Sequence, residues 1–500
     1  MTSTRTVLRF TPPTARVGDA LHHASAAAGN VEATTQAIET LSDTLTGSAP
    51  YERILLRAAA GAGKSYALKR MVEDALAHRK CARVGVTAFA NKQVFPLAED
   101  LGRQLGRERV CILVSRARAA DVPDTLLEHA TVVFGMSQLP EEAEVFLMTS
   151  HMLERAGWSI KDQLGPAADG EHSFDVLFVD EAWQLPLHRY RRVDRFAPVV
   201  VGVGDVGQLP PIDPNQNPWR GDPGYNPYRA WPTAYAADAA TWSTDLPAVW
   251  RPTAAQLPLW RAFYSEWEGL NCVAAPGDRS IVLGRRLRGD ASAVWSEVAA
   301  GVPTLVEVEG LDEAEAADID LPLLGVVEGL LDQLLRVGFE LRSAQYDGAG
   351  LPVGERVVKS ADPQGDPLIA VLATRNQAVD DATEMVERLV AKHDLADGVI
   401  VASTVDSWQG QTNGVTVAIH PLSGASALDE FNSAFGRLAV TCTRATHGLL
   451  MVSRSGLRDL LAVAPARPGI PLGEPGPREL PRQTHQRILD AFARTTIAGT

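Results

Sequence analysis

Short apolar runs alternate with helical patterns along most of the 500-residue chain, and this alternation restricts the possible folds more than any other feature. The runs have strand length and recur in two series, at 54–56, 84–86, 110–114, 145–148, 176–179 and 199–203, and then at 280–283, 304–308, 368–372, 399–403, 415–419 and 449–453. Strands that alternate with helices form parallel sheets covered by helices on both faces. The sequence therefore predicts an α/β fold with two sheets of similar size.

Changes in composition divide the chain further. Residues 17–48 have a helical pattern, 208–232 are rich in Pro, Gly and Asn and predict a long ordered loop, and 465–481 predict a linker before a short helix at 485–493. We expect an N-terminal segment at 1–33, a first domain at 34–270, a second at 271–462 and the linker and C-terminal helix at 463–500. Five arginines within 96–144 mark a candidate insertion, either a basic lip or an ordinary solvated helix face.

Charge and cysteine content exclude several classes of protein. The net charge of -14 argues against a uniformly positive surface, so a nucleic acid would need a local basic groove. The four cysteines lie too far apart for a local zinc or iron-sulfur site and are expected to be buried thiols of a reducing compartment. Because no run of about 18 apolar residues occurs, neither secretion nor membrane insertion is supported. We expect a cytoplasmic protein.

A loop of small residues, Ala58-Ala59-Ala60-Gly61-Ala62-Gly63-Lys64-Ser65, follows the first apolar run and precedes a helical pattern. Small residues allow backbone N–H groups to point at phosphates, a lysine adds charge beside the β and γ phosphates, and a serine hydroxyl can bind Mg²⁺. A Gly-Lys-Ser loop without a nucleotide is the alternative, which the strand and helix flanks disfavour. The predicted nucleotide contacts are Gly61, Ala62, Gly63, Lys64, Ser65 and Tyr66.

A second acidic motif, Val176-Leu177-Phe178-Val179-Asp180-Glu181, complements this loop. Its apolar run predicts a buried strand that ends at two carboxylates. Asp180 is then a candidate Mg²⁺ ligand, and Glu181 a candidate base that activates the attacking water. Acidic pairs at strand ends are also common as solvated caps, so the prediction of a Mg²⁺-ATP site depends on Lys64.

Further motifs follow in the order known from one family of motors. Gly204-Asp205-Val206-Gly207-Gln208-Leu209-Pro210-Pro211, Thr87-Ala88-Phe89-Ala90-Asn91, Trp250-Arg251, 368–376, 404–412 and 437–445 resemble motifs of superfamily 1 helicases. The resemblance covers residues 36–455. The motifs are similar to those of the branch that contains RecD, Dda and the nonsense-mediated-decay helicase. Two positions depart from the family pattern, because Ala58 replaces a glycine and Thr412 replaces a frequent acidic residue.

The resemblance implies two RecA-like P-loop NTPase domains that use ATP and Mg²⁺. It implies that Gln208 senses the γ-phosphate and that Arg251 and Arg444 supply charge to the transferring phosphoryl group; surface ion pairs are the alternative for both arginines. Nucleic-acid contacts are implied for Thr87, Asn91, Thr404 and Gln409. Gln36 is the candidate that reads adenine, although a solvent-facing helix glutamine explains it equally well.

Aromatic residues in the loop after Gln208 form a separate candidate track. Trp219 and Tyr225, with Tyr228, Trp231, Arg220 and Arg229, have the composition expected where bases stack on rings. Packing of aromatics against prolines is the competing explanation.

These features together predict an ATP-dependent translocase or helicase that moves on single-stranded nucleic acid. The resemblance favours DNA over RNA and 5′-to-3′ movement, both by analogy. No membrane partner is expected, and a protein partner would have to supply any nuclease or loading activity. The alternative is a nucleotide-gated clamp, a regulatory or defence module that holds nucleic acid or a partner without processive unwinding.

Overall fold

The computed structural model describes residues 8–15, 18–207, 211, 217–219, 225–264, 267, 269–316, 319–428, 432, 435–464 and 481–499. The chain packs as two compact units. The N-terminal unit consists of Gly29–Val206 with Pro210–Leu246, and the C-terminal unit consists of Pro247–Thr500 with Met1–Ala28 and Gly207–Leu209. The division therefore falls at residue 247, where a boundary near 270 was expected.

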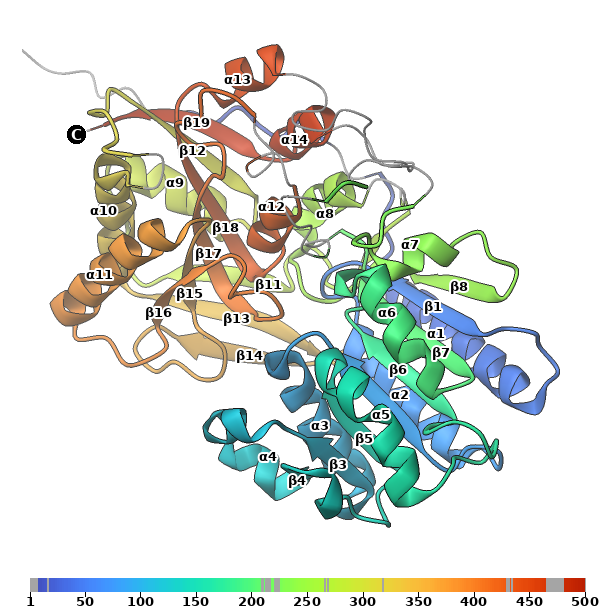
Figure 1. Ribbon diagram of the computed structural model, residues 1–500. Coiled ribbons are helices and arrows are strands. Elements are labelled where there is room, and N and C mark those ends of the chain that lie inside the picture. The colour runs from blue at the N-terminus through green and yellow to red at the C-terminus, as the bar shows by residue number, and fades with distance from the viewer. Residues whose placement is uncertain are drawn as a thin grey trace, which may run out of the picture. The chain divides into compact units, whose positions relative to one another are not determined.

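The N-terminal unit is built on one parallel sheet of eight strands in the order β4-β3-β5-β2-β6-β7-β1-β8 (Figure 1). The strands are β1 (Arg53–Ala58), β2 (Val84–Ala88), β3 (Val110–Leu113), β4 (Thr131–Val133), β5 (Val145–Thr149), β6 (Val176–Asp180), β7 (Val199–Asp205) and β8 (Thr241–Leu246). The helices are α1 (His23–Thr46), α2 (Lys64–Ala77), α3 (Asn91–Leu105), α4 (Asp124–His129), α5 (Ser150–Leu164), α6 (Leu187–Val193) and α7 (Trp231–Tyr235). Short 3-10 helices occupy Arg107–Arg109, Arg116–Asp121, Met136–Gln138, Ala182–Gln184 and Asp194–Phe196.

The apolar core of this unit follows the alternation of side chains along its strands. Leu55, Leu177 and Val179 belong to the cluster formed with the buried residues of α5 and α6, so these helices cover one face of the sheet. Helix α2 packs against β2, β6 and β7. Burial of the central strands on both faces explains why they read as continuous apolar runs in the sequence.

The C-terminal unit contains a parallel sheet of six strands in the order β16-β15-β17-β18-β12-β19, a three-stranded antiparallel sheet β11-β13-β14 and the short pair β9 and β10. Its strands are β9 (Ala248–Val249), β10 (Asn271–Cys272), β11 (Arg279–Leu283), β12 (Thr304–Glu309), β13 (Phe339–Tyr346), β14 (Pro352–Lys359), β15 (Ile369–Ala373), β16 (Ile400–Thr404), β17 (Asn413–Ile419), β18 (Ala445–Arg454) and β19 (Ala493–Ala498). Its helices are the 3-10 helix Ala254–Gln256 and α8 (Leu257–Phe263), α9 (Asp290–Ala299), α10 (Leu321–Val337), α11 (Asn376–His393), α12 (Phe435–Cys442), α13 (Leu457–Val463) and α14 (Pro481–Leu489).

The predicted α/β fold class is confirmed, because both units have a parallel sheet flanked by helices. Two expectations about segments differ from the structure. Residues 96–144 are part of the main sheet, since β3 and β4 extend it at one edge. The expected loop 208–232 ends earlier, where α7 begins at Trp231; several of its residues, and 465–480 of the expected linker, lie outside the described residues.

The C-terminal segment contains a strand in addition to the expected helix. β19 pairs in parallel with β12 and so becomes a strand of the six-stranded sheet. Its consecutive β-branched residues, Thr495, Thr496 and Ile497, favour an extended backbone, which is why the helix ends at Leu489, before the expected residue 493.

The four cysteines are buried and free, as predicted. Burial raises the pKa of Cys81, Cys111 and Cys272 to about 12. In the described part of the chain, no helix combines the length and the apolar character needed to cross a membrane.

Candidate nucleotide and nucleic-acid sites

The phosphate loop connects the end of β1 to the first turn of α2. Gly61 and Gly63 have φ angles of 72° and 94°, in the left-handed region that a glycine adopts without steric cost. Gly63 is also the residue directly before α2, whose first residue is Lys64. The loop therefore turns sharply into a helix N-terminus, where exposed N–H groups and the helix dipole favour an anion.

Lys64 lies among three carboxylates at this point. Its Nζ donates to Glu181 Oε1 at 2.8 Å, and both side chains are largely buried. Burial opposes the charged form of the lysine, but the charges of Glu181, Asp205 and Asp180 outweigh it and raise the pKa of Lys64. The structure thus brings the loop and the acidic motif together through Lys64 and Glu181.

The two consecutive acidic residues occupy different environments. Asp180 is buried at the end of β6, where burial and the neighbouring charge of Glu181 raise its pKa to about 7. Glu181 follows with a φ of 50°, an uncommon conformation for a residue with a side chain. Its backbone N–H donates to Asp180 Oδ1 at 3.0 Å. The two carboxylates therefore follow different backbone conformations, Asp180 on the strand and Glu181 in the turn after it.

The donor chemistry fits Mg²⁺. Carboxylate and hydroxyl oxygens are the ligands that this ion uses together with phosphate oxygens and water. Asp180 supplies the carboxylate, and Ser65 supplies an exposed hydroxyl in the first turn of α2. Three carboxylates around one ammonium also leave an excess of negative charge that a divalent cation would balance.

Asp205 was missed as a site residue, although it belongs to one of the quoted motifs. It is nearly fully buried at the end of β7 and pairs in register with Ala58, the residue at the end of β1. An acidic residue directly after a buried strand was the available signal. Within the same motif the sensing role was assigned to Gln208, which lies outside the described residues.

A second residue that the sequence analysis missed, on α1, contacts the backbone of the phosphate loop. Asn30 of α1 is buried, and its Nδ2 donates to the carbonyl oxygen of Ala62 at 2.8 Å. This bond fixes the direction of one loop peptide. Gln36, one and a half turns further along α1, is exposed, and its Nε2 donates to Glu32 Oε1 at 3.3 Å. The structure thus directs Asn30 rather than Gln36 to the loop.

The segment 87–91 exposes a different side chain from the one expected. Thr87 is fully buried in β2 between β5 and β6, because a central strand is covered on both faces. Phe89, two residues later, is 45% exposed, and Asn91 is partly exposed at the start of α3. A nucleic acid at this edge could therefore touch Phe89 and Asn91, but not Thr87 as it is placed here.

Gln93 links this segment to the acidic turn. Its Oε1 accepts the N–H of Ala90 at 2.9 Å, and its Nε2 donates to Gln184 Oε1 at 3.1 Å. The backbone N–H of Gln184 in turn donates to the carbonyl of Glu181 at 2.8 Å. A short path of hydrogen bonds therefore runs from the exposed segment to Glu181.

The aromatic loop divides into packed and exposed rings. Trp231 is buried and stacks on Tyr190 with ring centroids 3.9 Å apart, and Tyr228 packs edge-on against His188. These two rings therefore pack against aromatic side chains of α6. Trp219 and Tyr225 are 40% and 41% exposed and contact each other edge-to-face. Arg220 lies outside the described residues.

In the C-terminal unit, the structure brings together the two candidate arginines. Arg251 Nη1 donates to the carbonyl of Thr443 at 3.1 Å, directly beside Arg444 in the chain. Arg444 is almost fully buried; its Nε donates to the Val440 carbonyl at 3.2 Å and its Nη2 to Thr443 Oγ1 at 3.0 Å. Burial of an arginine with specific hydrogen bonds argues against the surface ion pair for Arg444.

The other predicted motif lies at the end of β16. Thr404 Oγ1 accepts the N–H of Ser407 at 3.0 Å, and Gln409 is partly exposed in the turn that follows. Sequence reasoning missed Asn413, whose Oδ1 accepts the indole N–H of Trp408 at 3.0 Å and whose backbone N–H donates to the carbonyl of Arg444 at 3.2 Å. Asn413 thus ties the motif at 404–412 to the one at 437–445.

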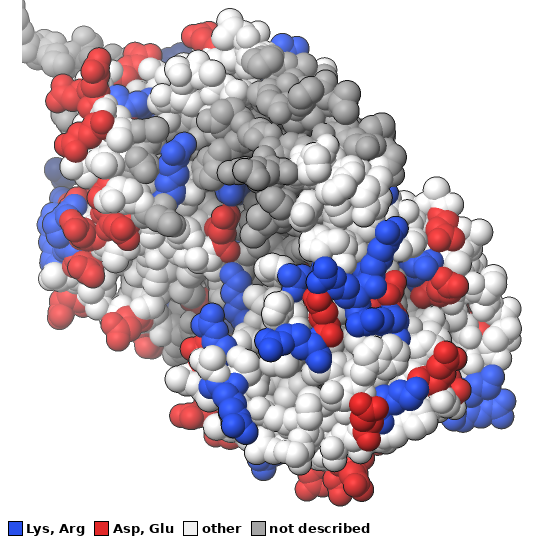
Figure 2. Space-filling model, in the orientation of Figure 1, with Lys and Arg blue, Asp and Glu red and all other residues white. Residues whose placement is uncertain are grey.

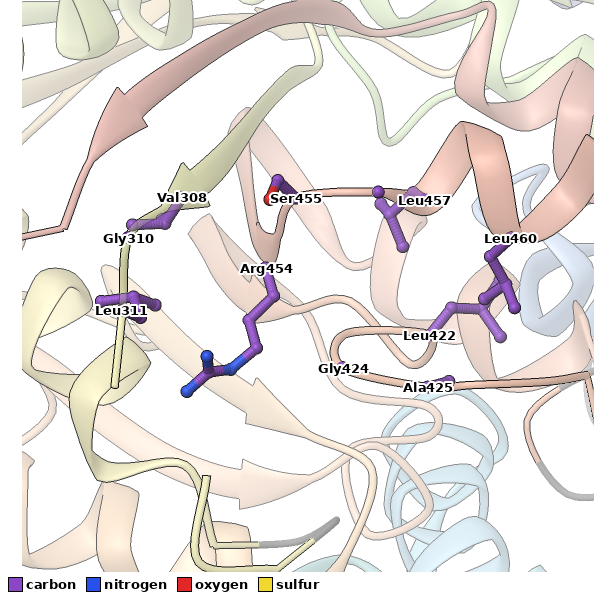
Figure 3. A pocket seen from close by; sticks show the side chains of 11 residues that line it. Val308, Gly310, Leu311, Leu422, Gly424, Ala425, Arg454, Ser455, Leu457 and Leu460 are labelled. Carbon is purple, nitrogen blue, oxygen red and sulfur yellow. The ribbon is translucent and has the colours of Figure 1, made fainter. Parts of the chain in front are cut away.

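A cavity of about 350 Å³ in the same unit lies apart from these residues (Figure 3). It opens where β12 and β18 end and is lined by Val308, Gly310, Leu311, Leu422, Gly424, Ala425, Arg454, Ser455, Gly456, Leu457 and Leu460. None of the predicted site residues is among them. The guanidinium of Arg454 already binds Asp320 at 2.7 and 2.8 Å, and Glu307 already accepts the N–H groups of Gly456 and Leu457.

Comparison with known proteins gives distant structural likenesses. No family model matches the sequence, and no curated protein matches it. The arterivirus nonstructural protein 10 helicase aligns at 15% identity with a TM-score of 0.38, over 84% of this chain and 63% of that one. The complex of this helicase with DNA aligns at 15% identity with a TM-score of 0.37, over 84% of this chain and 64% of that one. The PRRSV helicase aligns at 14% identity with a TM-score of 0.37, over 83% of this chain and 56% of that one. The chain therefore spans less than two thirds of these helicases, and at such low values we base the function on the site residues themselves.

Proposed function

We propose that this protein is a motor of the superfamily 1 helicase type that couples hydrolysis of Mg²⁺-ATP to movement on single-stranded nucleic acid. The observation that carries the proposal is the meeting of Lys64 with Glu181, Asp180 and Asp205 beside a glycine-dependent loop at a helix N-terminus. Loop, lysine and strand-end carboxylates are what phosphoryl transfer requires. The order of the remaining motifs supports a motor over a simple kinase or GTPase.

The Lys64–Glu181 pair suggests how binding prepares hydrolysis. Phosphate oxygens beside Lys64 would replace Glu181 as its partner, which leaves that carboxylate to accept a proton from the attacking water. Asp180 and Ser65 would hold the Mg²⁺ ion, which neutralises charge on the β and γ phosphates when bound. Arg251 and Arg444 are proposed to stabilise charge on the transferring phosphoryl group, and Gln208 to sense the γ-phosphate.

The proposed nucleic-acid contacts are Phe89, Asn91, Trp219 and Tyr225 in the N-terminal unit and Thr404 and Gln409 in the C-terminal unit. The three rings are exposed, as stacking on bases requires. The resemblance to RecD and Dda favours DNA and 5′-to-3′ movement. A partner that loads the motor, or that carries a nuclease, belongs to the same proposal.

The test is ATP hydrolysis by the full-length protein, alone and with single-stranded DNA, single-stranded RNA and duplex. We expect a Mg²⁺-dependent rate that single strands stimulate and that Lys64→Ala removes. Displacement of a strand from duplexes with 5′ or 3′ tails then measures unwinding and its direction. Hydrolysis that no nucleic acid stimulates would replace the motor by the nucleotide-gated clamp, and absence of hydrolysis with every nucleic acid would contradict the proposed enzyme.

A further inference from the structure

Six exposed or partly exposed residues of the N-terminal unit form two groups of rings and cations, which Arg191 and Arg195 place about one helical turn apart. The contacts run from Trp219 to Tyr225 with ring centroids 5.9 Å apart, and from Tyr225 to Arg191, whose Cζ lies 5.9 Å from the ring centre. Arg195, one turn after Arg191, lies 5.7 Å from the ring centre of Trp158, and Lys161 Nζ lies 5.9 Å from the same ring. We call these six residues the aromatic–cation strip.

Trp158 is the unexpected member of this strip. It lies in the second half of α5, far in sequence from every predicted motif, and its side chain is 45% exposed. The ring is nevertheless held in place, because it packs edge-on against the buried Phe196 with centroids 5.2 Å apart. Phe196 can approach Trp158 this closely because the residue before Trp158 is Gly157. A Cβ atom at position 157 would lie 2.4 Å from the Phe196 ring. A ring that is exposed and held in one orientation can stack on a flat partner without first being ordered.

The strip keeps positive charge available. Of the arginines of α6, Arg192 and Arg189 have Glu154 as a partner, at 2.6 and 4.0 Å. Among the described residues, no carboxylate lies within 4.0 Å of Arg191 or Arg195. Asp194, between them in sequence, is partly buried, and burial raises its pKa although the charges of Arg53, Arg191 and Arg195 act in the opposite direction. Figure 2 shows Lys and Arg side chains gathered over the region where Figure 1 labels α6.

The chemistry of the strip selects one class of partner. Exposed rings with cations beside them match a chain that carries both stacking surfaces and negative charges, which describes single-stranded nucleic acid. An acidic peptide would use the cations but would leave three exposed rings without a flat partner. The net charge of -14 favours binding of a polyanion at the strip over binding elsewhere, because a polyanion would be repelled from most of the remaining surface.

We propose that single-stranded nucleic acid continues from Trp219 and Tyr225 along α6 to Trp158, which stacks on a base while Arg195 and Lys161 bind neighbouring phosphates. This inference rests on the proposed function, which assigns Trp219 and Tyr225 to the nucleic-acid surface, and it extends that surface onto α5. Trp158, Arg195 and Lys161 form a second contact, so only strands long enough to span the strip reach them.

The test is binding of labelled oligothymidylates of increasing length to the full-length protein, measured by fluorescence anisotropy at fixed salt. Trp158→Ala should weaken binding of long strands by roughly five- to hundredfold, the range for one stacked base, and leave short strands unchanged. Trp158→Phe keeps a ring and should bind long strands nearly as well as wild type. Leu127→Ala, an exposed apolar residue of α4 outside the strip, is the matched control.

The charge contribution has its own measurement. Removal of one phosphate contact from a single strand lowers the slope of log Kd against log salt by about 0.7. Arg195→Gln should show this change with long strands, whereas Arg118→Gln, an exposed arginine of the same unit that pairs with Asp121, should not. This measurement also decides the matter if Trp158→Ala fails to fold.

Three results would overturn the inference. They are unchanged long-strand binding by Trp158→Ala or, where that variant does not fold, an unchanged slope for Arg195→Gln; equal weakening of short and long strands; and a wild-type protein that polyglutamate displaces from strands as well as unlabelled oligothymidylate does. If Trp219→Ala and Tyr225→Ala weaken binding while Trp158→Ala does not, the extension fails and the proposed function stands. If the wild-type protein binds no strand of any length, both fail.

Discussion

The nucleotide site and the aromatic–cation strip lie in the same unit but use their charges in opposite ways. At the nucleotide site, Lys64 is largely buried and pairs with Glu181, with two more carboxylates nearby. Along the strip, Arg191 and Arg195 are exposed and lie over rings. A buried charge without its partner is costly, whereas an exposed one is cheap. Changes at the nucleotide site should therefore act on turnover and be large, and changes along the strip should act on binding and be graded.

The largest effect is expected from Lys64→Ala. It removes the cation that faces the phosphates and leaves three carboxylates without their ammonium, so ATP hydrolysis should fall to background in a steady-state phosphate-release assay. Lys69→Ala is the control, because Lys69 lies on the same helix and pairs with Asp100. Wild-type turnover by Lys64→Ala would mean that the loop does not bind the nucleotide.

Arg444→Ala extends the comparison to the C-terminal unit, where the arginine is buried and bonds to Val440 and Thr443. Turnover should fall by ~10³ to 10⁵, the range for an arginine that stabilises the transferring phosphoryl group, while ATP affinity stays within a small factor. Arg444→Lys should rescue little, because an ammonium lacks the planar fork. Arg388→Ala, an exposed arginine paired with Glu328, controls for the loss of charge. Normal turnover in Arg444→Ala would leave the arginine a structural role.

Glu181→Gln separates binding from chemistry at the nucleotide site. Loss of the base should slow hydrolysis by about 10² to 10⁴, while ATP should bind at least as tightly because Lys64 loses its competing carboxylate. Titration with a fluorescent ATP analogue measures the second effect. Glu144→Gln, which changes an ion pair with Arg109, is the matched control. A variant that no longer binds nucleotide would show that Glu181 supports the loop instead.

On the strip, replacing Trp219 and Tyr225 by Ala should weaken single-strand binding by roughly 1 to 3 kcal/mol per stacked base. Hydrolysis at saturating nucleic acid should change much less, since the phosphate loop is untouched. Both measurements need the same salt concentration, because phosphate contacts make affinity salt-dependent. Affinity equal to that of wild type would favour the packing explanation for these rings.

The smallest effect is expected at Asn30, which contacts the loop from behind. Asn30→Ala loses the donor to Ala62 without burying a charge and should raise the KM for ATP by about fivefold, the worth of one neutral hydrogen bond, with kcat nearly unchanged. GTP and ATP should be affected equally. Gln36→Ala on the same helix is the contrast, because a glutamine that reads adenine would change the preference between these two nucleotides.

The sequence predicted the nucleotide site far better than the strip, and the reason is the spacing of the residues. Lys64 and Asp180 each follow a buried strand at a fixed offset, and carboxyl ends of parallel strands meet at one edge of a sheet. Trp158, Arg195 and Tyr225 come from three segments with no common pattern, so only packing brings them together.

Other differences have equally local causes. Thr87 follows the expected strand run 84–86, but β2 extends to Ala88, and the pairing of β2 with β5 and β6, which buries Thr87, depends on the strand order. Asn30 was missed because a helix residue gives no sign of which loop it will contact. β19 was missed because a short strand after a Pro- and Gly-rich stretch has few apolar residues to reveal it.

β19 has a practical consequence for anyone who shortens or tags the protein. It is the outermost strand of the six-stranded sheet, and it covers β12 along the whole length of that strand. Trimming the chain before Ala493 would leave the backbone groups of β12 open along one side. Unpaired strand edges recruit strands from other molecules, so such a shortened protein should precipitate or self-associate even though every residue of the ATP and nucleic-acid sites is intact.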